Sequence, residues 1–445
     1  MKLHYLLLVA LFLSACSTHT QVTTIKKPTV LSEKKTEVKT VLDLEKIPQT
    51  PSFYTQNIDE KKFSLDDFYK KYFRVWKIKK PSESLTSIMW AHKSFTPKNS
   101  YGENLQPISQ DFFDTVLENS NFAEFATLNR KALSLDLLNM RVFPTQKPLF
   151  RDPSRAGEGF PFDYMQNSSL AANKPLLVSH YSKDKKWVFV ESSFAFGWVQ
   201  SKDIAFVQED DAALLQSKEQ VFIVREGVPI YSQDGEFLFY SRIGMLFAFI
   251  DEDSNSYTVL SPLRTRLGEV IFTHSKILKT DANRGALAFN GENIQKILEE
   301  IYPSKYGWGG MYEERDCSST LRDFYAPFGL WLPRNSSAQA QKGVKISLEN
   351  LSEDAKKETI KKHAVPFETL LYKKGHIVIY VGNYNDEIII FQNVWGVKTE
   401  INQKEGRFIV GKTLFSTLEL GKELEEFDQK SSLLKNLKSM NLLTQ

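Results

Sequence analysis

The spacing of hydrophobic positions changes twice along this chain. In residues 53–138, aromatic and apolar side chains recur every three or four positions behind a Ser cap, most clearly at 64–73 and 109–117. This spacing predicts amphipathic helices, so we expect an N-terminal helical segment at 53–138. After Met140 the period becomes two, which is the period of β-strands. Past Thr280 both periods occur, and the fold class is predicted to be α+β.

The strand region contains a weak internal repeat. Residues 176–190 and residues 246–260 each read as strand, polar turn and strand. The repeat predicts two small β-barrels, at residues 139–208 and 209–278. With Gly197-Trp198-Val199 after its hairpin, the first copy resembles the bacterial SH3 (SH3b) domains.

The N-terminus carries an export pattern. Lys2 precedes nine apolar residues at 5–13, and small residues stand directly before Cys16. Nine apolar residues are too few to span a bilayer, so residues 1–15 are predicted to be a signal peptide. The run resembles the lipobox of bacterial lipoproteins, which implies acylation of Cys16 and attachment of the protein to a membrane. Ser17 after the cysteine favours the outer membrane, with the protein facing the periplasm.

Residues 16–52 contain no aromatic residue and no Gly, and are rich in Thr, Lys, Glu and Val. Such a segment buries too little apolar surface to offset the entropy lost on ordering. It is therefore predicted to be a flexible tether between the anchor and the folded domains.

Composition and charge indicate a globular protein that is not expected to bind nucleic acid. The chain of 445 residues is 42% hydrophobic and 25% charged, which is ordinary globular composition, and at ~150 residues a domain it suffices for about three domains. The 57 basic and 54 acidic side chains leave a formal net charge of +3. This balance provides no basic field for non-specific nucleic-acid binding, so nucleic acid is not an expected partner.

A glycine-rich turn followed by a cysteine holds the candidate chemistry. After Tyr306-Gly307-Trp308-Gly309-Gly310, Asp316 is a good N-cap for a helix at 317–325 that stops before Pro327. Cys317 opens that helix, where partial positive charge lowers a thiol's pKa and holds an oxyanion. A lone cysteine is usually a buried, inert thiol, but an exported protein gains little from an unpaired thiol that does not react.

A nucleophilic thiol needs a base, and His376 is the best placed of the histidines. It stands at the start of an apolar strand at 375–382, and a short loop leads to a second strand at 388–396. The two strands are expected to form a hairpin, in which either Gln392 or Asn393 lies beside His376 and orients the imidazole. The other histidines occur without a motif and are expected to be surface or core groups.

Tyr306-x-Trp308-Gly309-Gly310, Asp316-Cys317-Ser318 and Gly375-His376 together resemble the NlpC/P60 family of papain-like cysteine peptidases. The chain is similar to members that place a helical segment and two SH3b domains before the catalytic domain. That domain would occupy residues 279–425 and leave 426–445 as a charged C-terminal helix or tail. The resemblance implies a peptidoglycan endopeptidase that cleaves stem peptides between γ-D-glutamate and the diamino acid. Neither a metal nor a cofactor is expected.

The resemblance also implies roles for single residues. Cys317 matches the nucleophile and His376 the general base, and Tyr306 matches the tyrosine close to the thiol. Asp316 and Ser318 match residues that bind the N-terminal end of the stem.

Three further positions complete the expected site. Ser336 matches the family's substrate-contacting serine. Glu158, in a charged loop of the first barrel, either binds the free α-amine of the stem or belongs to a solvated turn. Gln392 occupies the third catalytic position, where the family usually has His. A neutral amide fixes the imidazole tautomer but cannot stabilise imidazolium by charge.

Two other functions stay open from the residues alone. An inert catalytic domain would make the chain an envelope scaffold that binds cell wall or a partner through its SH3b domains. An active Cys-His pair would equally serve an amidase or a peptidase for another bond, because the pair catalyses any acyl transfer.

Overall fold

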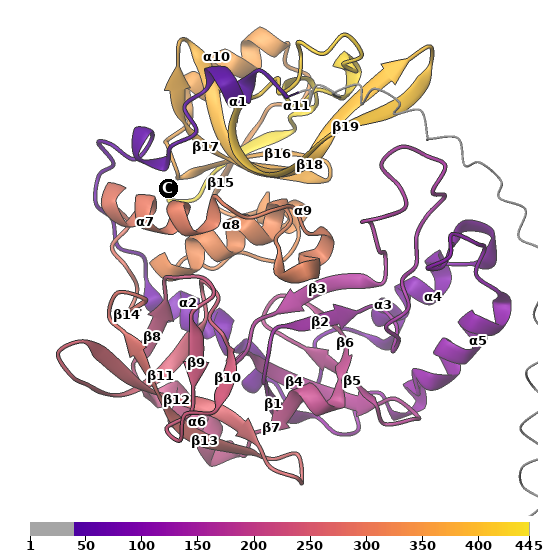
Figure 1. Cartoon of the computed structure of the whole chain (residues 1–445), viewed down its shortest axis with the longest axis vertical. Coiled ribbons are helices and arrows are strands. Elements are labelled where there is room, and N and C mark those ends of the chain that lie inside the picture. Colours follow the sequence, from indigo (N-terminus) through magenta and orange to yellow (C-terminus); the bar gives the residue numbers. More distant parts are fainter. Residues whose placement is uncertain (1–39, 445) are drawn as a thin grey trace, which may run out of the picture. The chain divides into compact units, whose positions relative to one another are not determined.

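A computed structural model describes residues 40–444 of the chain (Figure 1). The predicted signal peptide 1–15, Cys16 and the tether as far as residue 39 lie outside the described residues. None of the helices between residues 40 and 444 has the length and apolar content needed to cross a membrane.

A helical segment leads into the barrels, as predicted. Helix α2 (Leu65–Tyr72) buries Phe68 and Tyr72, and helix α5 (Gln110–Asn119) begins at Ser109, whose hydroxyl accepts from the Phe112 N–H at 3.4 Å. The other elements here are η1 (Pro51–Phe53), η2 (Arg74–Trp76), α3 (Leu85–Ile88), α4 (Trp90–Ser94), η3 (Pro97–Asn99) and η4 (Phe122–Glu124).

The first predicted barrel is a seven-stranded sheet in the order β3-β2-β6-β5-β4-β1-β7. Its elements are β1 (Arg130–Ser134), β2 (Leu138–Arg141), β3 (Gln166–Leu170), β4 (Pro175–Tyr181), β5 (Trp187–Glu191), β6 (Phe196–Gln200), η5 (Ser201–Asp203) and β7 (Ile204–Phe206). The predicted hairpin at 176–190 is the pair β4 and β5. Strand β1 pairs with β4 and β7, so the sheet begins before the predicted boundary at residue 139. Those partners are distant in sequence, and local periodicity does not reveal them.

The second barrel follows helix α6 (Glu209–Ser217) and repeats the hairpin as β11 and β12. A five-stranded sheet runs β13-β12-β11-β8-β14, and β9 and β10 form a separate pair. The strands are β8 (Gln220–Ile223), β9 (Pro229–Tyr231), β10 (Phe237–Tyr240), β11 (Leu246–Glu252), β12 (Ser256–Arg264), β13 (Val270–Leu278) and β14 (Ala282–Arg284).

The last part of the chain, the predicted catalytic region, is a mixture of helices and strands with a six-stranded sheet in the order β15-β20-β16-β17-β18-β19. Its helices are α7 (Gly291–Ile301), η6 (Trp308–Glu313), α8 (Cys317–Tyr325), η7 (Ala326–Phe328), α9 (Ser336–Gln339), α10 (Glu353–His363), η8 (Gln429–Ser431) and α11 (Leu433–Asn436). Its strands are β15 (Val344–Ser347), β16 (Thr369–Lys373), β17 (His376–Tyr384), β18 (Glu387–Ile401), β19 (Lys404–Thr417) and β20 (Ser439–Leu442).

The C-terminal segment predicted at 426–445 contains the short helix α11 but is not a tail, because after α11 the chain adds strand β20 to this sheet. Strand β20 lies between β15 and β16 and pairs antiparallel with both. All four of its residues are buried, Met440 and Asn441 among them. The segment is charged on average, but its last apolar side chains complete the core.

The end of the predicted tether is also ordered. Helix α1 (Asp43–Lys46) packs on β19, and the Asp43 carboxylate accepts from the Thr417 N–H at 2.9 Å. The Gln49 amide pairs with the backbone of Phe415, donating at 2.8 Å and accepting at 3.1 Å. An amide side chain thus takes the place of a further strand along the edge of β19, so folded structure begins before residue 53.

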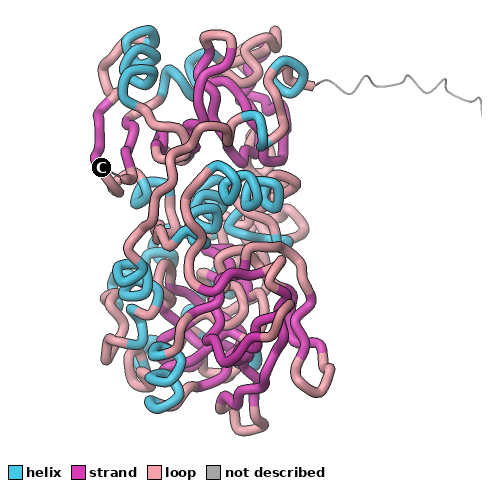
Figure 2. The backbone as a smooth tube through the Cα atoms, turned by 90° about the vertical axis from the view of Figure 1, so that its left-hand side faces the viewer, coloured by secondary structure: helices cyan, strands magenta, loops and turns pink. Residues whose placement is uncertain are grey.

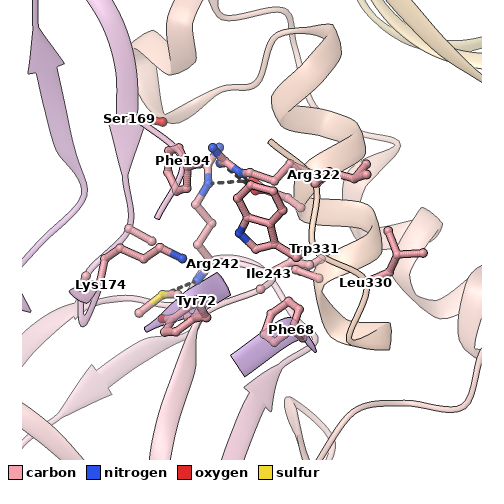
Figure 3. Close-up of a pocket in the computed structure, with 17 residues that line it drawn as sticks. Phe68, Tyr72, Ser169, Lys174, Phe194, Arg242, Ile243, Arg322, Leu330 and Trp331 are labelled. Atoms are coloured by element: carbon pink, nitrogen blue, oxygen red, sulfur yellow. Dashed lines mark hydrogen bonds and ion pairs between the residues drawn. The ribbon is translucent and has the colours of Figure 1, made fainter. Parts of the chain in front are cut away.

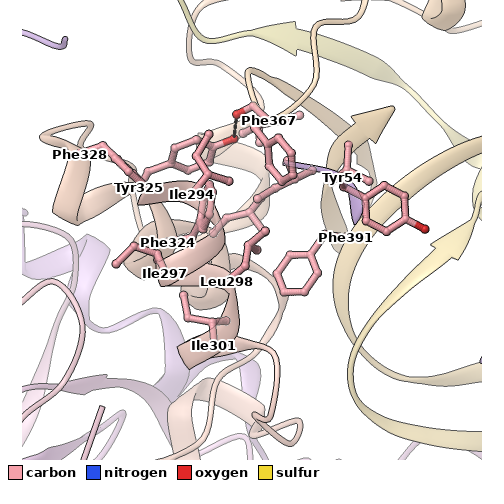
Figure 4. Close-up of a cluster of buried hydrophobic side chains, with 14 of the residues drawn as sticks. Tyr54, Ile294, Ile297, Leu298, Ile301, Phe324, Tyr325, Phe328, Phe367 and Phe391 are labelled. Atoms are coloured by element: carbon pink, nitrogen blue, oxygen red, sulfur yellow. Dashed lines mark hydrogen bonds between the residues drawn. The ribbon is translucent and has the colours of Figure 1, made fainter. Parts of the chain in front are cut away.

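A hydrophobic core joins helices α7 and α8 to the catalytic sheet (Figure 4). Ile294, Ile297 and Leu298 of α7 pack with Phe324 of α8 and Phe391 of β18, and none of these side chains is exposed. Both backbone views show a layer of helices between the catalytic sheet and the barrel strands (Figures 1 and 2). This core fixes the start of α8 against the sheet.

Candidate active site

The cysteine lies where the sequence predicts, at the first position of α8. The Asp316 side chain accepts from the Ser319 N–H at 2.8 Å and the Ser319 hydroxyl accepts from the Asp316 N–H at 2.9 Å, which is a reciprocal cap. Cys317 is 8% exposed. The helix ends at Tyr325, as its sequence signals predict.

The glycines before this helix lie against the first barrel. Gly309 and Gly310 have φ values of 61° and 86°, and a side chain on either would collide with β3, at Gln166 or at Ser169. The indole of Trp308 donates to the Asp163 carbonyl at 3.0 Å. Only glycine lets this turn approach the barrel so closely.

His376 is held by Gln392. The Gln392 amide oxygen accepts from His376 Nε2 at 2.7 Å, and its amide nitrogen donates to the Ser416 hydroxyl at 2.7 Å. Ser416 in turn donates to the Thr417 carbonyl at 2.9 Å. The chain of bonds fixes the amide orientation and leaves Nδ1 of the imidazole as the unprotonated nitrogen.

Asn393 lies on the other face of β18 and does not contact His376. Its side-chain nitrogen donates to the Arg315 carbonyl at 2.8 Å and lies 3.2 Å from the Thr320 hydroxyl. Of the two residues that the sequence offers, Gln392 is the one beside the imidazole.

Burial keeps the thiol and the imidazole neutral. Burial, followed by the charge of Asp316, raises the pKa of Cys317 to about 12, although N–H groups of Ile377 and Ser318 favour the thiolate. Burial lowers the pKa of His376 to about 4, although the hydrogen bond that His376 donates to Gln392 acts in the opposite direction. The pKa of this thiol is therefore raised and not lowered as expected at a helix start, because burial and the Asp316 charge outweigh the N–H groups and Arg334.

Asp316 is paired with an arginine that sequence reasoning did not single out. Arg334 binds the Asp316 carboxylate at 2.6 Å, donates to the Ser318 hydroxyl at 3.0 Å and reaches Ser168 of the first barrel at 2.8 Å. Burial alone would raise the pKa of Asp316, but the charge and hydrogen bonds of Arg334 hold it below its usual range. In the sequence, the feature that could have pointed to Arg334 is its position two residues before the predicted site residue Ser336.

A cleft of about 790 Å³ runs past the thiol. It brings together five predicted residues, which are Tyr306, Asp316, Cys317, Ser318 and Ser336. Its other wall comes from the first barrel and the helical segment, including Tyr164, Glu191 and Trp90. Burial, and then the proximity of Cys317, raises the pKa of Tyr306 well above its ordinary value, so the phenol remains a donor.

Three predicted residues lie outside that cleft: Glu158, His376 and Gln392. Glu158 accepts from the Tyr164 hydroxyl at 3.0 Å, so it stands behind a cleft residue without lining the cleft itself. His376 and Gln392 line a separate cavity of about 330 Å³.

Within residues 40–444, no three His, Cys, Asp or Glu side chains lie close enough to hold a metal ion.

Comparisons with protein families divide the chain in the same way. Residues 303–404 match the NlpC/P60 family, 148–200 an SH3 domain of SH3b1 type, and 208–254 an SH3 domain of SH3b2 type. Residues 5–125 match the N-terminal stabilising domain of NlpC/P60 proteins. No curated protein sequence matches the chain.

Solved structures agree at the level of the fold. An NlpC/P60 endopeptidase from Photobacterium damselae subsp. piscicida superimposes with a TM-score of 0.78 at 23% identity, over 90% of this chain and 98% of that one. An NlpC/P60 family protein from Bacillus cereus reaches 0.42 at 15% identity, over 62% and 81% of the two chains, which is too low to carry an argument. The chain thus has an α+β architecture in which two SH3b domains precede a domain of the NlpC/P60 cysteine peptidase family.

Proposed function

We propose that the protein is a cysteine endopeptidase that cleaves peptidoglycan stem peptides between γ-D-glutamate and the diamino acid. The observation that carries the proposal is the arrangement of Cys317 at the start of α8, in a cleft, with an imidazole on the adjoining strand oriented by Gln392. A thiol, a base and a group that orients the base are the parts that acyl transfer requires.

In this mechanism Nδ1 of His376 takes the proton from the Cys317 thiol as the sulfur attacks the γ-glutamyl carbonyl carbon. The N–H of Cys317 and the phenol of Tyr306 stabilise the oxyanion. The imidazolium then protonates the leaving amine, the C–N bond breaks and a thioester remains. Water, activated by the same imidazole, releases the acid and restores the thiol. Because both groups are neutral in the free protein, the proton moves during attack and not before it.

Substrate recognition would use the polar groups around Asp316. A free α-ammonium would share the Asp316 carboxylate with Arg334, and the hydroxyls of Ser318 and Ser336 offer further hydrogen bonds. Glu158 would act through Tyr164, or belong to the solvated face of its loop.

The location is part of the proposal. Acylation at Cys16 would hold the protein at the bacterial outer membrane, facing the periplasm, where stem peptides occur. Fractionation of cells that carry Cys16→Ala tests this part, because the variant should move from the membrane to the soluble fraction. Membrane-bound, unprocessed variant protein would instead indicate an uncleaved leader.

The activity is tested by mass spectrometry of muropeptides digested with purified protein. Products split after γ-D-glutamate support the proposed bond, and products split elsewhere indicate an amidase or another peptidase. Binding to cell wall without turnover would favour the envelope scaffold, whose SH3b domains would then carry the function.

A further inference from the structure

A small cavity lies where four parts of the chain meet, and the proposed reaction does not use it (Figure 3). Its volume is about 50 Å³, which is room for a few water molecules or one compact ion. The helical segment contributes Tyr72, the first barrel Lys174, the second barrel Arg242, and the catalytic region Arg322 and Trp331.

The wall of this cavity carries more positive than negative charge. Three cations line it, and Asp323 is the one carboxylate among the lining residues. That carboxylate is already shared: Arg322 contacts one oxygen at 2.8 Å, while Arg315 and Arg242 contact the other at 2.8 Å and 3.5 Å. Asp323 therefore cannot neutralise the cations that surround it.

Two of the cations have donors to spare. Nη1 of Arg322 is buried and has no hydrogen-bond partner. The Lys174 ammonium lies over the Tyr72 ring, 3.7 Å from its centroid, and makes no hydrogen bond or ion pair with any residue between 40 and 444. Buried donors without an acceptor are rare in folded proteins, so Nη1 of Arg322 calls for a partner, and the Lys174 ammonium offers further donors to that partner.

The lowered pKa values of two of these cations also favour a negative ion in the cavity. Burial, and then the charge of Arg322, lowers the pKa of Lys174 well below its ordinary value. Burial and the charge of Arg315 likewise lower the pKa of Arg242. A negative ion in the cavity would relieve both effects.

We propose that this cavity binds one compact inorganic anion, chloride or phosphate, between the Lys174 ammonium and Nη1 of Arg322. The ion would accept from both donors and offset the excess charge at the junction. Phe194 and Trp331 line both this cavity and the cleft, so the bound ion would brace one wall of the cleft. The proposal does not depend on catalysis.

Thermal unfolding of the purified full-length protein tests the site. At constant ionic strength, replacing sodium gluconate by sodium chloride or sodium phosphate should raise the unfolding temperature saturably, by roughly 1–3 °C. Gluconate should have no such effect because it is too bulky for the cavity. An equal rise in all three salts would be general screening and would overturn the proposal.

Lys174→Met should lose the saturable rise. Lys342→Met is the matched control, since Lys342 likewise lies over an aromatic ring, that of Trp331 at 5.3 Å from the centroid, but does not line the cavity. Loss of the rise in both variants, or in neither, would contradict the assignment.

Anomalous diffraction from crystals soaked in bromide gives a test that needs no variant. A peak within hydrogen-bond distance of Lys174 Nζ and Arg322 Nη1 is expected. An empty cavity would refute the site, and a peak there without saturable stabilisation would mean an adventitious ion only.

Discussion

The amide oxygen of Gln392 accepts from Nε2 of His376 at 2.7 Å, at the position that the family resemblance matches to a histidine. A neutral acceptor fixes the tautomer of the imidazole without adding charge. Burial lowers the pKa of His376 to about 4, and the hydrogen bond to Gln392 offsets only part of that shift.

Variants of Gln392 distinguish the effect of orienting the His376 imidazole from the effect of placing a charge beside it. Gln392→Ala should reduce kcat by about 10–100-fold, because a group that orients a functional imidazole has gone. Gln392→His should keep or raise activity, and Gln392→Glu should raise the pKa of His376 and move the acid limb of the rate profile to higher pH. Turnover of a defined stem peptide against pH measures all three. A neutral Gln392→Ala would mean that backbone or water holds His376, or that His376 is not the base.

The raised pKa of Cys317 makes a prediction about its reactivity. Thiolate is scarce below pH 9 when the thiol pKa is about 12, so alkylation by iodoacetamide should be slow and should still increase with pH at pH 9. Cys317→Ala should abolish turnover and leave the unfolding temperature nearly unchanged. A rate of alkylation that levels off near neutral pH would show a stable thiolate and contradict this picture.

Removal of Arg334 should leave Asp316 as an uncompensated buried charge. Arg334→Met is expected to cost about 3–5 kcal/mol in the free energy of unfolding at pH 7. In the wild type the pKa of Asp316 is lowered, so its stabilising effect is present above the ordinary pKa of about 4 and is lost as pH falls through the lowered value. In the variant burial would raise that pKa, so the difference from wild type should shrink on acidification.

Chemical denaturation between pH 4 and pH 8 measures this difference. Arg266→Met is the control, since Arg266 is exposed on the second barrel and its loss should change little. Asp316→Asn should recover stability in the Arg334→Met background. A difference that is independent of pH would argue against the ion pair.

The buried strand β20 predicts an unusual sensitivity at the C-terminus. Met440 is fully buried, and Met440→Ala should lower the free energy of unfolding by about 2–5 kcal/mol. Lys345→Ala, on the exposed side of the neighbouring strand β15, should have little effect. Equal, small effects of the two changes in urea denaturation would mean that β20 is dispensable.

The features that the sequence predicts correctly depend on residues close to one another in the chain. The N-cap Asp316 and the stop before Pro327 lie within or beside the helix they bound, so α8 was predicted from Cys317 to Tyr325. Strand alternation similarly allowed Gln392 or Asn393 as the partner of His376, and the register of β18 decides for Gln392.

The missed features depend on contacts between distant segments. Arg334 stands close to Ser336 in the sequence, but its pairing with Asp316 and Ser168 is seen only in the folded chain. The four residues of β20 are too few for a periodic pattern, and their burial comes from the strands on either side. The raised pKa of Cys317 reflects the depth of the site, which a helix cap does not indicate.

The position of β20 also sets the order in which the chain folds. A ribosome makes strands β15 and β16 long before β20, yet the two are joined only through it. The sheet therefore cannot be completed until β20 is synthesised, and before that β16 has a neighbouring strand on one side only. Because contacts between segments far apart in sequence form slowly, pairing of β20 with β15 and β16 should be a late step in folding.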